Sequence, residues 1–287
     1  MKNIKQQLKA LYKECFSDSD ECVEYLFCNR LGIHNARYEM LNNEIVAEMF
    51  LVKKLLKYKN KEISTPFVVG LCTKTDYRKK GIALRLMKKS LINLQSAFVM
   101  LYPAVKGFYE KMDFATISYD NILTHDYMMH ECDYPQRLLD IYNLYNKDKD
   151  FYIKLDLKGF EQKIAIAKKD NGGFFVLEKG GKIKGFTNKD ESIVLNQLPE
   201  KSGVMARVVD LKKAFELSGL SINTKIMLTD SLIEKNNINF YVDKGKVIET
   251  NDFDLKMSIS ELTLHFFGLG SKLKQFDKLN GHILERY

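Results

Sequence analysis

The spacing of apolar residues changes several times along the chain, and each change predicts a helix or a strand. Residues 2–15 and 20–31 carry apolar side chains three and four positions apart, which is typical of amphipathic helices. Antiparallel strands are expected next, at residues 36–40, 45–55 and 59–64, with a turn at Asn42 and Asn43. Two helices and an antiparallel meander therefore lead into a more informative stretch.

A strand, a basic turn and a helix are predicted together between Thr65 and Lys89. Phe67–Thr73 is apolar and β-branched, as buried strands are, and apolar residues return at helical spacing from Ile82 onward. Between them lies the turn Arg78–Ala83, which has the pattern R-x-x-G-x-A. Backbone N–H groups at the start of a helix attract anions, and glycine lets the backbone approach a phosphate closely. The turn is therefore predicted to bind an anion.

A second short strand and an aromatic helix follow the basic turn. The strand is expected over Phe98–Pro103, and Phe108, Tyr109 and Phe114 then form the pattern F-Y-x-x-x-x-F. This order of elements, with the R-x-x-G-x-A turn and the aromatic pattern, resembles the GNAT superfamily of N-acetyltransferases. The resemblance implies that the turn cradles the pyrophosphate of acetyl-coenzyme A (acetyl-CoA). That family usually has glycine where this chain has Asp113, in the turn after the tyrosine helix.

The resemblance also implies which residues contact the cofactor. The pantetheine arm of acetyl-CoA would lie along the backbone of the first strand, and its pyrophosphate against the basic turn. The implied cofactor-binding residues are Leu71, Cys72, Thr73, Arg78, Lys79, Lys80, Gly81, Ile82 and Ala83, with Arg85 as a further helper. The Cys72 thiol is either a nucleophile or a buried neighbour of the strand, and we expect the buried neighbour.

Tyr109 is the candidate general acid, because its place in the aromatic pattern matches that of the acid in the family. A phenol of pKa about 10 can give its proton to a departing thiolate whose pKa is about 8.5. The alternative is a tyrosine that only fills an apolar core, and Glu110 is expected to be its surface neighbour. Backbone N–H groups near Leu71–Thr73 would polarise the thioester carbonyl.

Two further units are predicted beyond residue 134. Pro135 opens one helix and residues 160–166 lie in a second, before a hairpin turned at Gly180 and Gly181. The segment has no R-x-x-G-x-A turn, so no second cofactor is expected there. After a boundary at Pro199 we expect a strand over 204–210 that ends at the helix cap Asp210, and then a helix that ends at Gly219. Strands are expected next within 224–229, 240–248 and 253–257, followed by a helix capped by Ser260.

The C-terminal third carries a second resemblance. Met205–Asp210, with the later leucine-rich helix and Gly268, resembles the sterol-carrier-like domain of Eis-type (enhanced intracellular survival) acetyltransferases. The resemblance covers nearly the whole chain and implies α/β and α+β folds: a GNAT acetyltransferase domain at 1–134, a reduced second GNAT-like segment at 135–199 and a sterol-carrier-like α+β domain at 200–287. The middle segment is shorter than the family's second GNAT domain. A homo-oligomer is also implied.

In Eis-type enzymes the terminal α-carboxylate acts as the general base, which assigns that role to Tyr287 by resemblance. A carboxylate can deprotonate an ammonium group, and burial raises its pKa towards a useful range. The alternative is a frayed, exposed chain end. His282 and Glu285 are the substitutes for this base.

The implied function is transfer of acetyl from acetyl-CoA to a primary amine of an aminoglycoside, a polyamine or a lysine, directly within a ternary complex. Cationic acceptors need an acidic cleft, and the candidates near the second helix are Asp18, Asp20, Glu21 and Glu24. The alternative is a coenzyme A-binding module of weak activity, which binds an apolar ligand or partner through its sterol-carrier-like domain.

Composition narrows these alternatives. The 287 residues are 45% hydrophobic with a formal charge of +8, but the lysines are dispersed without interleaved aromatic residues, so no nucleic acid partner is expected. Five cysteines form no C-x-x-C pair, and His125, His130 and Cys132 are too few to indicate a metal site. No apolar run suits a secretory signal or a membrane span. We therefore expect a cytoplasmic protein with free thiols and no membrane contact.

Overall fold

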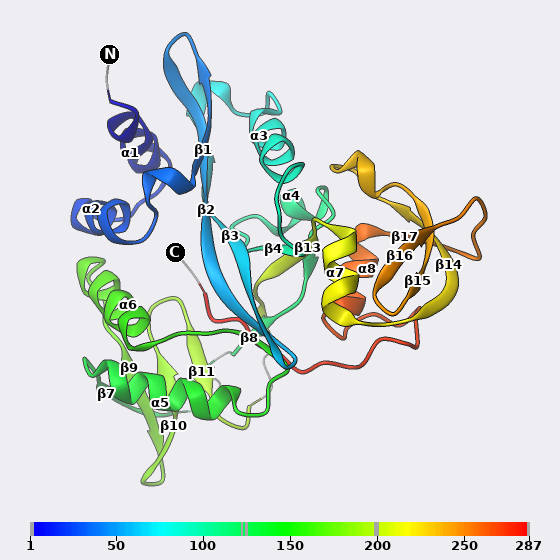
Figure 1. The fold of residues 1–287 in the computed structure, drawn as a ribbon. Coiled ribbons are helices and arrows are strands. Elements are labelled where there is room, and N and C mark those ends of the chain that lie inside the picture. The colour runs from blue at the N-terminus through cyan, green and yellow to red at the C-terminus, as the bar shows by residue number, and fades with distance from the viewer. Residues whose placement is uncertain (1–2, 122, 124–125, 198–200, 286–287) are drawn as a thin grey trace.

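The computed structural model describes residues 3–121, 123, 126–197 and 201–285. These residues form three lobes around one long hairpin of β2 (Glu44–Tyr58) and β3 (Lys61–Thr73), as Figure 1 shows. The N-terminal helices lie beside this hairpin, a middle lobe lies below them, and a C-terminal lobe lies on the other side of the central sheet.

The central sheet has seven strands and draws on all three lobes. Its order is β1-β2-β3-β4-β13-β5, with β8 paired to the distal part of β2. The remaining bounds are β1 (Ala36–Leu41), β4 (Phe98–Leu101), β5 (Ala115–Thr116), β8 (Phe151–Ile153) and β13 (Met205–Val208). The antiparallel β1-β2-β3 meander is confirmed, whereas β3 and β4 run parallel. The strand expected near residue 204 forms, but it lies between β4 and β5.

β3 carries a bulge and then separates from β4. Opposite the single residue Met49 of β2, β3 places both Gly70 and Leu71. Gly70 has a φ of +62°, and a Cβ there would lie 3.0 Å from the Tyr12 ring, so glycine is required at this position. The ladder that joins β3 to β4 involves only Phe67–Val68 on the β3 side among the described residues. Beyond the bulge, the backbone of β3 therefore faces an opening.

Helices cover both faces of the central sheet. α1 (Ile4–Cys15) and α2 (Asp20–Asn29) pack on one face, and α3 (Ile82–Leu91) and α4 (Lys106–Glu110) pack on the other. The apolar residues that predicted α1 and α2 are buried, except Ile4, which is half-buried, and the Ser19 side chain caps α2 by accepting from Cys22 N. None of the helices in the described ranges is long and apolar enough to cross a membrane.

The middle lobe packs two helices on a small antiparallel sheet of order β11-β10-β9-β7. Its elements are β7 (Met128–Glu131), α5 (Pro135–Asn146), α6 (Leu157–Lys169), β9 (Phe175–Lys179), β10 (Lys182–Thr187) and β11 (Ser192–Val194); β6 (Tyr119–Asp120) and β12 (Lys201–Ser202) form a separate pair. The predicted start of a helix at Pro135 and the hairpin turn at Gly180 and Gly181 are confirmed. β8 was not predicted.

The C-terminal lobe has a sheet of order β16-β15-β14-β17 with two helices. Its elements are α7 (Leu211–Ser218), β14 (Ile222–Thr229), β15 (Asn239–Asp243), β16 (Lys246–Glu249), β17 (Leu255–Ser258) and α8 (Ile259–Phe266). Asp210 caps α7 and Gly219 ends it in the left-handed conformation, both as predicted. The predicted cap of α8 at Ser260 is wrong. Ser258 is the N-cap, because its side chain accepts from Glu261 N in a capping box, and Ser260 lies in the first turn.

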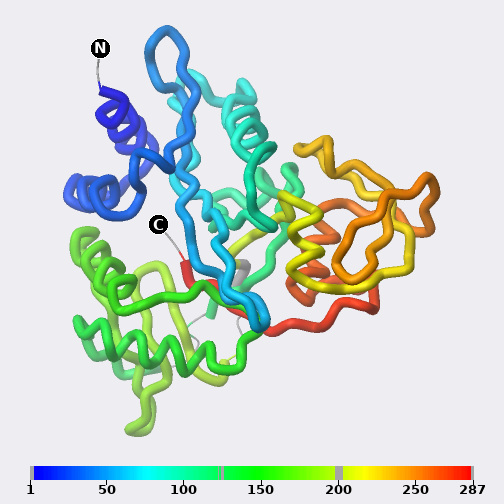
Figure 2. Tube along the Cα trace, viewed as in Figure 1, coloured from blue at the N-terminus to red at the C-terminus, as the bar shows by residue number. Residues whose placement is uncertain are grey.

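After α8 the chain runs back to the central sheet, as the red end of the tube in Figure 2 shows. His282 N donates to the carbonyl of Phe151 at 3.1 Å, and Ile283 N donates to Ser118 Oγ at 2.9 Å. Leu284 joins the apolar core of the middle lobe. The domain boundaries expected near Pro135 and Pro199 stay predictions. β8, from residues 135–199, and β13, from residues 200–287, both lie in the central sheet. Pro199 itself is outside the described residues.

Candidate active site

The basic turn leads into α3 with the helix amides open. η2 (Thr75–Tyr77) precedes the turn, and Gly81, at a φ of +72°, is the N-cap of α3. No described side chain caps this helix, and a Cβ built on Gly81 would meet only Arg85 Nη1, at 3.7 Å. An anion at the N-terminus of α3 would therefore meet uncapped N–H groups and the positive end of the helix dipole.

Two arginines brace the turn. Arg78 Nε donates to the Thr73 carbonyl at 3.0 Å, and Arg85 Nη1 donates to the Lys80 carbonyl at 3.0 Å. Lys80 Nζ lies 5.2 Å from the centroid of the Tyr77 ring. The turn thus presents exposed cations on a defined backbone, and these residues fit a pyrophosphate.

A cavity of about 400 Å³ lies where β3 separates from β4. Its walls come from α2 and the connection before it, the Phe67–Leu71 part of β3, the segment after β4, α4, and four residues of the middle lobe, which are Ile166, Asp170, Lys189 and Asp190. Leu71 lines the cavity, and two residues further along the Thr73 carbonyl is held by Arg78. β3 therefore links the cavity to the basic turn.

Tyr109 lines this cavity from α4. Its side chain is largely buried and packs edge-on against Phe108, at 5.1 Å between centroids, and Phe114, at 6.0 Å. Burial raises the pKa of the Tyr109 phenol to about 12. The phenol is therefore protonated at neutral pH and can act as a proton donor.

Three aspartates line the same cavity. Asp18 precedes α2, Asp170 follows α6, and Asp190 lies in the β10–β11 connection beside Lys189. Burial raises the pKa of the Asp18 carboxyl, although the Tyr12 hydroxyl donates to its Oδ2 at 3.0 Å. Lys189 also lines the cavity and pairs with Asp170 at 3.0 Å, which offsets part of this negative charge. A cation with more than one amine would therefore meet chiefly Asp18 and Asp190, which form the acidic wall of the cavity.

Of the four acidic residues predicted to line a cleft, only Asp18 lines this cavity. Asp20 pairs with Lys13 at 2.6 Å, Glu21 with Lys169 at 3.9 Å, and Glu24 with Lys9. The sequence reasoning missed Asp170 and Asp190 because both come from the middle lobe, far along the chain. Acidic residues at a helix end or beside a hairpin are common on protein surfaces, so their place in the sequence does not indicate a binding site.

Two thiols lie beside the basic turn. The side chain of Cys72 is buried, as expected, and hydrogen-bonds to Cys15 at the end of α1. Arg78 Nη2 donates to Cys15 Sγ at 3.8 Å. The hydrogen bond from Cys72 and the charge of Arg78 outweigh burial and lower the pKa of Cys15 to about 6. No local pattern in α1 indicates that its last residue lies beside Cys72 and Arg78.

Glu48 is a buried carboxyl beside this thiol pair, opposite Cys72 in the β2–β3 ladder. Neither carboxyl oxygen accepts a hydrogen bond from a described residue. Burial raises the pKa of Glu48 to about 9, so the side chain is neutral in the folded protein at pH 7.

Glu48→Gln is therefore expected to stabilise the fold, and more strongly as pH rises. The folded pKa lies above the unfolded one, so the carboxyl costs free energy that grows from about pH 4.5 to about pH 9. At pH 8 the gain should be roughly 2 to 4 kcal/mol, and at pH 5 less than about 1 kcal/mol. Urea unfolding at both pH values measures it. An equal effect at the two pH values would mean that Glu48 is not held neutral.

The C-terminal segment carries a buried ion cluster. Glu285 Oε1 lies 2.8 Å from Arg30 Nη2 and 2.5 Å from Lys54 Nζ, and Glu285 Oε2 lies 3.8 Å from Lys163 Nζ. Lys163 also pairs with Glu191 at 2.9 Å. Arg30 directly follows α2, Lys54 lies on β2 and Lys163 on α6, so Glu285 joins the N-terminal and middle lobes.

This arrangement disfavours Glu285 and His282 as proton acceptors. Burial would raise the pKa of Glu285, but Lys54, Lys163 and Arg30 outweigh it and lower the pKa to about 2. Burial, with Lys149 nearby, lowers the pKa of His282 to about 3. Tyr287, the base implied by resemblance, lies outside the described residues.

Comparison with known families identifies the first part of the chain. Residues 2–117 match the model of a family described as acetyltransferase (GNAT) domain. The match spans α1 to β5, including the basic turn and Tyr109. The chain therefore contains a GNAT acetyltransferase domain. No curated protein matches the sequence.

Solved structures extend the likeness to nearly the whole chain. Eis1 from Mycobacterium abscessus is 11% identical with a TM-score of 0.68, over 96% of this chain and 97% of that one. A probable N-acyltransferase from Enterococcus faecalis V583 is 14% identical with a TM-score of 0.65, over 93% of this chain and 88% of that one. A GCN5-related N-acetyltransferase from Anabaena variabilis ATCC 29413 is 16% identical with a TM-score of 0.63, over 92% of this chain and 87% of that one. At these identities the likeness shows the fold.

The family match supports an acetyl-CoA-dependent acyltransferase. The expected resemblance to Eis holds for the fold of the chain. The sterol-carrier-like character of the C-terminal lobe and a shortened middle segment remain predictions.

Proposed function

We propose that the protein transfers the acetyl group of acetyl-CoA to a primary amine of a cationic acceptor, directly and within a ternary complex. One observation carries the proposal: Tyr109, the bulged part of β3 and three aspartates line a single cavity of about 400 Å³. Amine acetylation needs a proton donor for the leaving group and a wall that attracts the amine, and this cavity combines the two.

The cofactor is proposed to lie along β3 and over the basic turn. Acetyl-CoA, when bound, supplies the thioester that is cleaved. The residues proposed to hold it are the backbone of Leu71, Cys72 and Thr73, and Arg78, Lys79, Lys80, Gly81, Ile82 and Ala83. The uncapped N-terminus of α3 and the exposed cations of the turn support the pyrophosphate site.

Tyr109 is the proposed general acid. As the amine nitrogen bonds to the acetyl carbon, the carbon–sulfur bond breaks, and the Tyr109 hydroxyl gives its proton to the sulfur. Its pKa of about 12 keeps that proton in place until it is needed. The proposed base, by resemblance to Eis-type enzymes, is Tyr287, which lies outside the described residues.

The proposed acceptor carries several amines, as a polyamine or an aminoglycoside does, or presents a lysine. The three aspartates of the cavity support this class. We also propose a cytoplasmic homo-oligomer with domains at 1–134, 135–199 and 200–287. The sheet of β14–β17 with α7 and α8 supports a sterol-carrier-like α+β third domain.

The test is thiol release from acetyl-CoA with a panel of monoamines, polyamines, aminoglycosides and lysine peptides. The proposal expects turnover with at least one multiply charged amine, and one acetylated amine per thiol released, measured by mass spectrometry. Cofactor binding without transfer to any amine would favour the coenzyme A-binding module that acts through an apolar ligand.

The acidic wall makes a specific prediction about acceptors. Asp190→Asn should raise KM for a diamine about three- to tenfold, because one charge–charge attraction across a partly solvated cavity is lost. KM for a monoamine and for acetyl-CoA should change less than twofold. Asp20→Asn removes a carboxylate outside the cavity and is the matched control. If both variants raised KM for the diamine equally, the carboxylates of the cavity would not be part of the acceptor site.

A further inference from the structure

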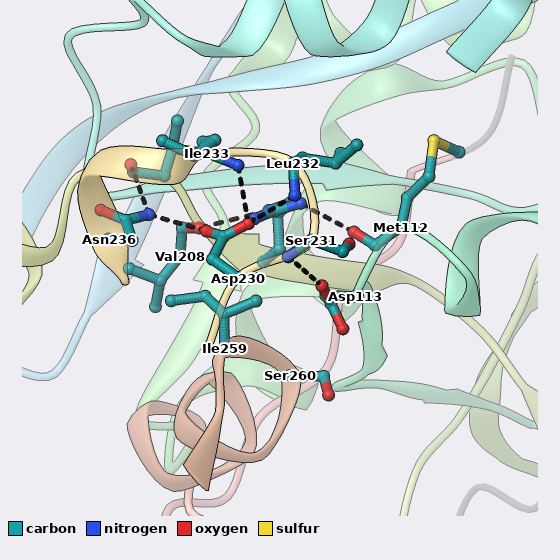
Figure 3. A network of polar contacts seen from close by, with 12 residues as sticks. Met112, Asp113, Val208, Asp230, Ser231, Leu232, Ile233, Asn236, Ile259 and Ser260 are labelled. Atoms are coloured by element: carbon teal, nitrogen blue, oxygen red, sulfur yellow. Dashed lines mark hydrogen bonds and ion pairs between the residues drawn. The ribbon is translucent and has the colours of Figure 1, made fainter. Parts of the chain in front are cut away.

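Asp113 occupies a backbone conformation that glycine adopts more easily. Its φ is +58°, in the turn that directly follows α4. A residue with a Cβ pays about 1 kcal/mol there relative to glycine. The side chain has a use: Asp113 Oδ2 accepts a hydrogen bond from Ser231 N at 2.9 Å, as Figure 3 shows. Ser231 belongs to the C-terminal lobe, so the turn after Tyr109 is tied to a segment more than a hundred residues away.

Arg207 makes a second tie to the same turn. It lies on β13 and is completely buried. Its Nη1 donates to the Met112 carbonyl at 2.7 Å, and its Nη2 pairs with Asp230 Oδ1 at 2.6 Å. The guanidinium also lies 5.9 Å from the centroid of the Phe114 ring. Arg207 therefore connects the turn after α4 with the segment that contains Ser231.

Asp230 keeps that segment rigid. Its Oδ1 accepts from Leu232 N at 2.9 Å and from Ile233 N at 2.8 Å, and its Oδ2 accepts from Asn236 Nδ2 at 2.8 Å (Figure 3). A buried carboxylate with these donors and one guanidinium is well satisfied. The loop Asp230–Asn236 is therefore a fixed support rather than a mobile connection.

The supported turn is bonded directly to the proposed acid. Met112 N and Phe114 N both donate to the Tyr109 carbonyl, at 2.9 and 3.1 Å. The residue between them, Asp113, is held by Ser231 of the C-terminal lobe, and the carbonyl of Met112 is held by Arg207 of β13, which pairs with Asp230 of that lobe. α4 has only five residues, so it cannot fix Tyr109 by its own length.

We propose that Asp113 and Arg207 are positioning residues for Tyr109, and that the loop Asp230–Asn236 of the C-terminal lobe is part of the acetyl-transfer machinery for this reason. The inference rests on the proposed role of Tyr109. It gives the C-terminal lobe a task in catalysis without a contact to either substrate.

Asp113→Gly is the decisive variant, because glycine keeps the positive φ and removes only the hydrogen bond to Ser231. A shift of the acid by a fraction of an ångström should lower kcat about tenfold, with KM for acetyl-CoA unchanged. The melting temperature should stay the same or rise, because glycine relieves the backbone cost. Asp113→Asn keeps an acceptor and tolerates positive φ, and should restore most of kcat. Lys244→Gly, at another positive φ on the β15–β16 turn, is the matched control.

Amide hydrogen exchange over residues 109–114 supplies a readout that does not depend on turnover. The proposal expects about tenfold faster exchange at Met112 and Phe114 in Asp113→Gly, and wild-type exchange in Asp113→Asn. Unchanged exchange in Asp113→Gly overturns the proposal. The proposal is also overturned if adding Asp113→Gly to Tyr109→Phe lowers kcat as much as Asp113→Gly lowers it in the wild type, because Asp113 would then not act through Tyr109. Failure of the proposed function is a different result: no turnover by the wild type, with the exchange difference still present.

Discussion

Tyr109→Phe should lower kcat for acetyl transfer by about 10²- to 10³-fold, which is the usual effect of removing a positioned general acid. The dissociation constant for acetyl-CoA should change less than twofold, because the proposed cofactor contacts lie on β3 and the basic turn. Stopped-flow or steady-state thiol release measures the first quantity, and calorimetric titration measures the second.

The pH dependence of Tyr109 has a definite sign. Burial raises the pKa of its phenol to about 12, so the acid stays protonated throughout the range in which the protein can be assayed. Between neutral pH and about pH 11, deprotonation of Tyr109 should therefore cause no loss of kcat, and a loss from this group is expected only at higher pH. Tyr119→Phe removes a phenol from an exposed side chain, 40% accessible, and is the matched control. If Tyr109→Phe kept more than a third of the wild-type kcat, Tyr109 would be a core residue and the acid would lie elsewhere.

Glu285→Gln should destabilise the protein by about 3 to 5 kcal/mol at pH 7. It removes the buried carboxylate that faces Arg30, Lys54 and Lys163, and uncompensated buried cations cost about this much. Urea unfolding at pH 7 measures the loss. Asp277→Asn breaks an exposed ion pair with Lys59 and should cost less than about 1 kcal/mol. A loss below about 1 kcal/mol in Glu285→Gln would show that the cluster does not hold the lobes together.

The same carboxyl predicts how the wild type responds to acid. Its pKa of about 2 lies below the value of about 4.5 in the unfolded chain, so its contribution is complete above about pH 4.5 and is lost as pH falls towards 2. The contribution is roughly 3 kcal/mol, from about two and a half pKa units. Glu285→Gln lacks this group, so its stability should fall less steeply between pH 4.5 and 2.

The local elements of the GNAT part could be predicted from sequence, because short-range rules decide them. Gly81 sits between a basic turn and a run at helical spacing, and the structure makes it the left-handed N-cap of α3. Asp210 and Gly219 likewise mark the ends of α7. Serine is common at N-caps, so both Ser258 and Ser260 suit that position, and the capping box selects Ser258 because Glu261 lies three residues after it.

The long-range parts could not be predicted. β13 has the pattern of a buried strand, and nothing in that pattern shows that it pairs with β4 from the first hundred residues. Asp190 reaches the cavity, and Arg207 reaches the turn after Tyr109, only through the tertiary fold. Neither residue lies in a recognisable motif, and each is placed near Tyr109 only by the packing of its lobe or strand.

Titration of acetyl-CoA into the wild-type protein tests whether β3 and the basic turn bind the cofactor. We expect saturable binding of one cofactor per chain, with a steep loss of affinity at high salt because the proposed pyrophosphate site is an exposed cationic turn. Chemical-shift changes or protection from exchange should map to Leu71–Thr73 and Arg78–Ala83. Binding elsewhere, or no binding at millimolar acetyl-CoA, would show that this strand and turn are not the cofactor site.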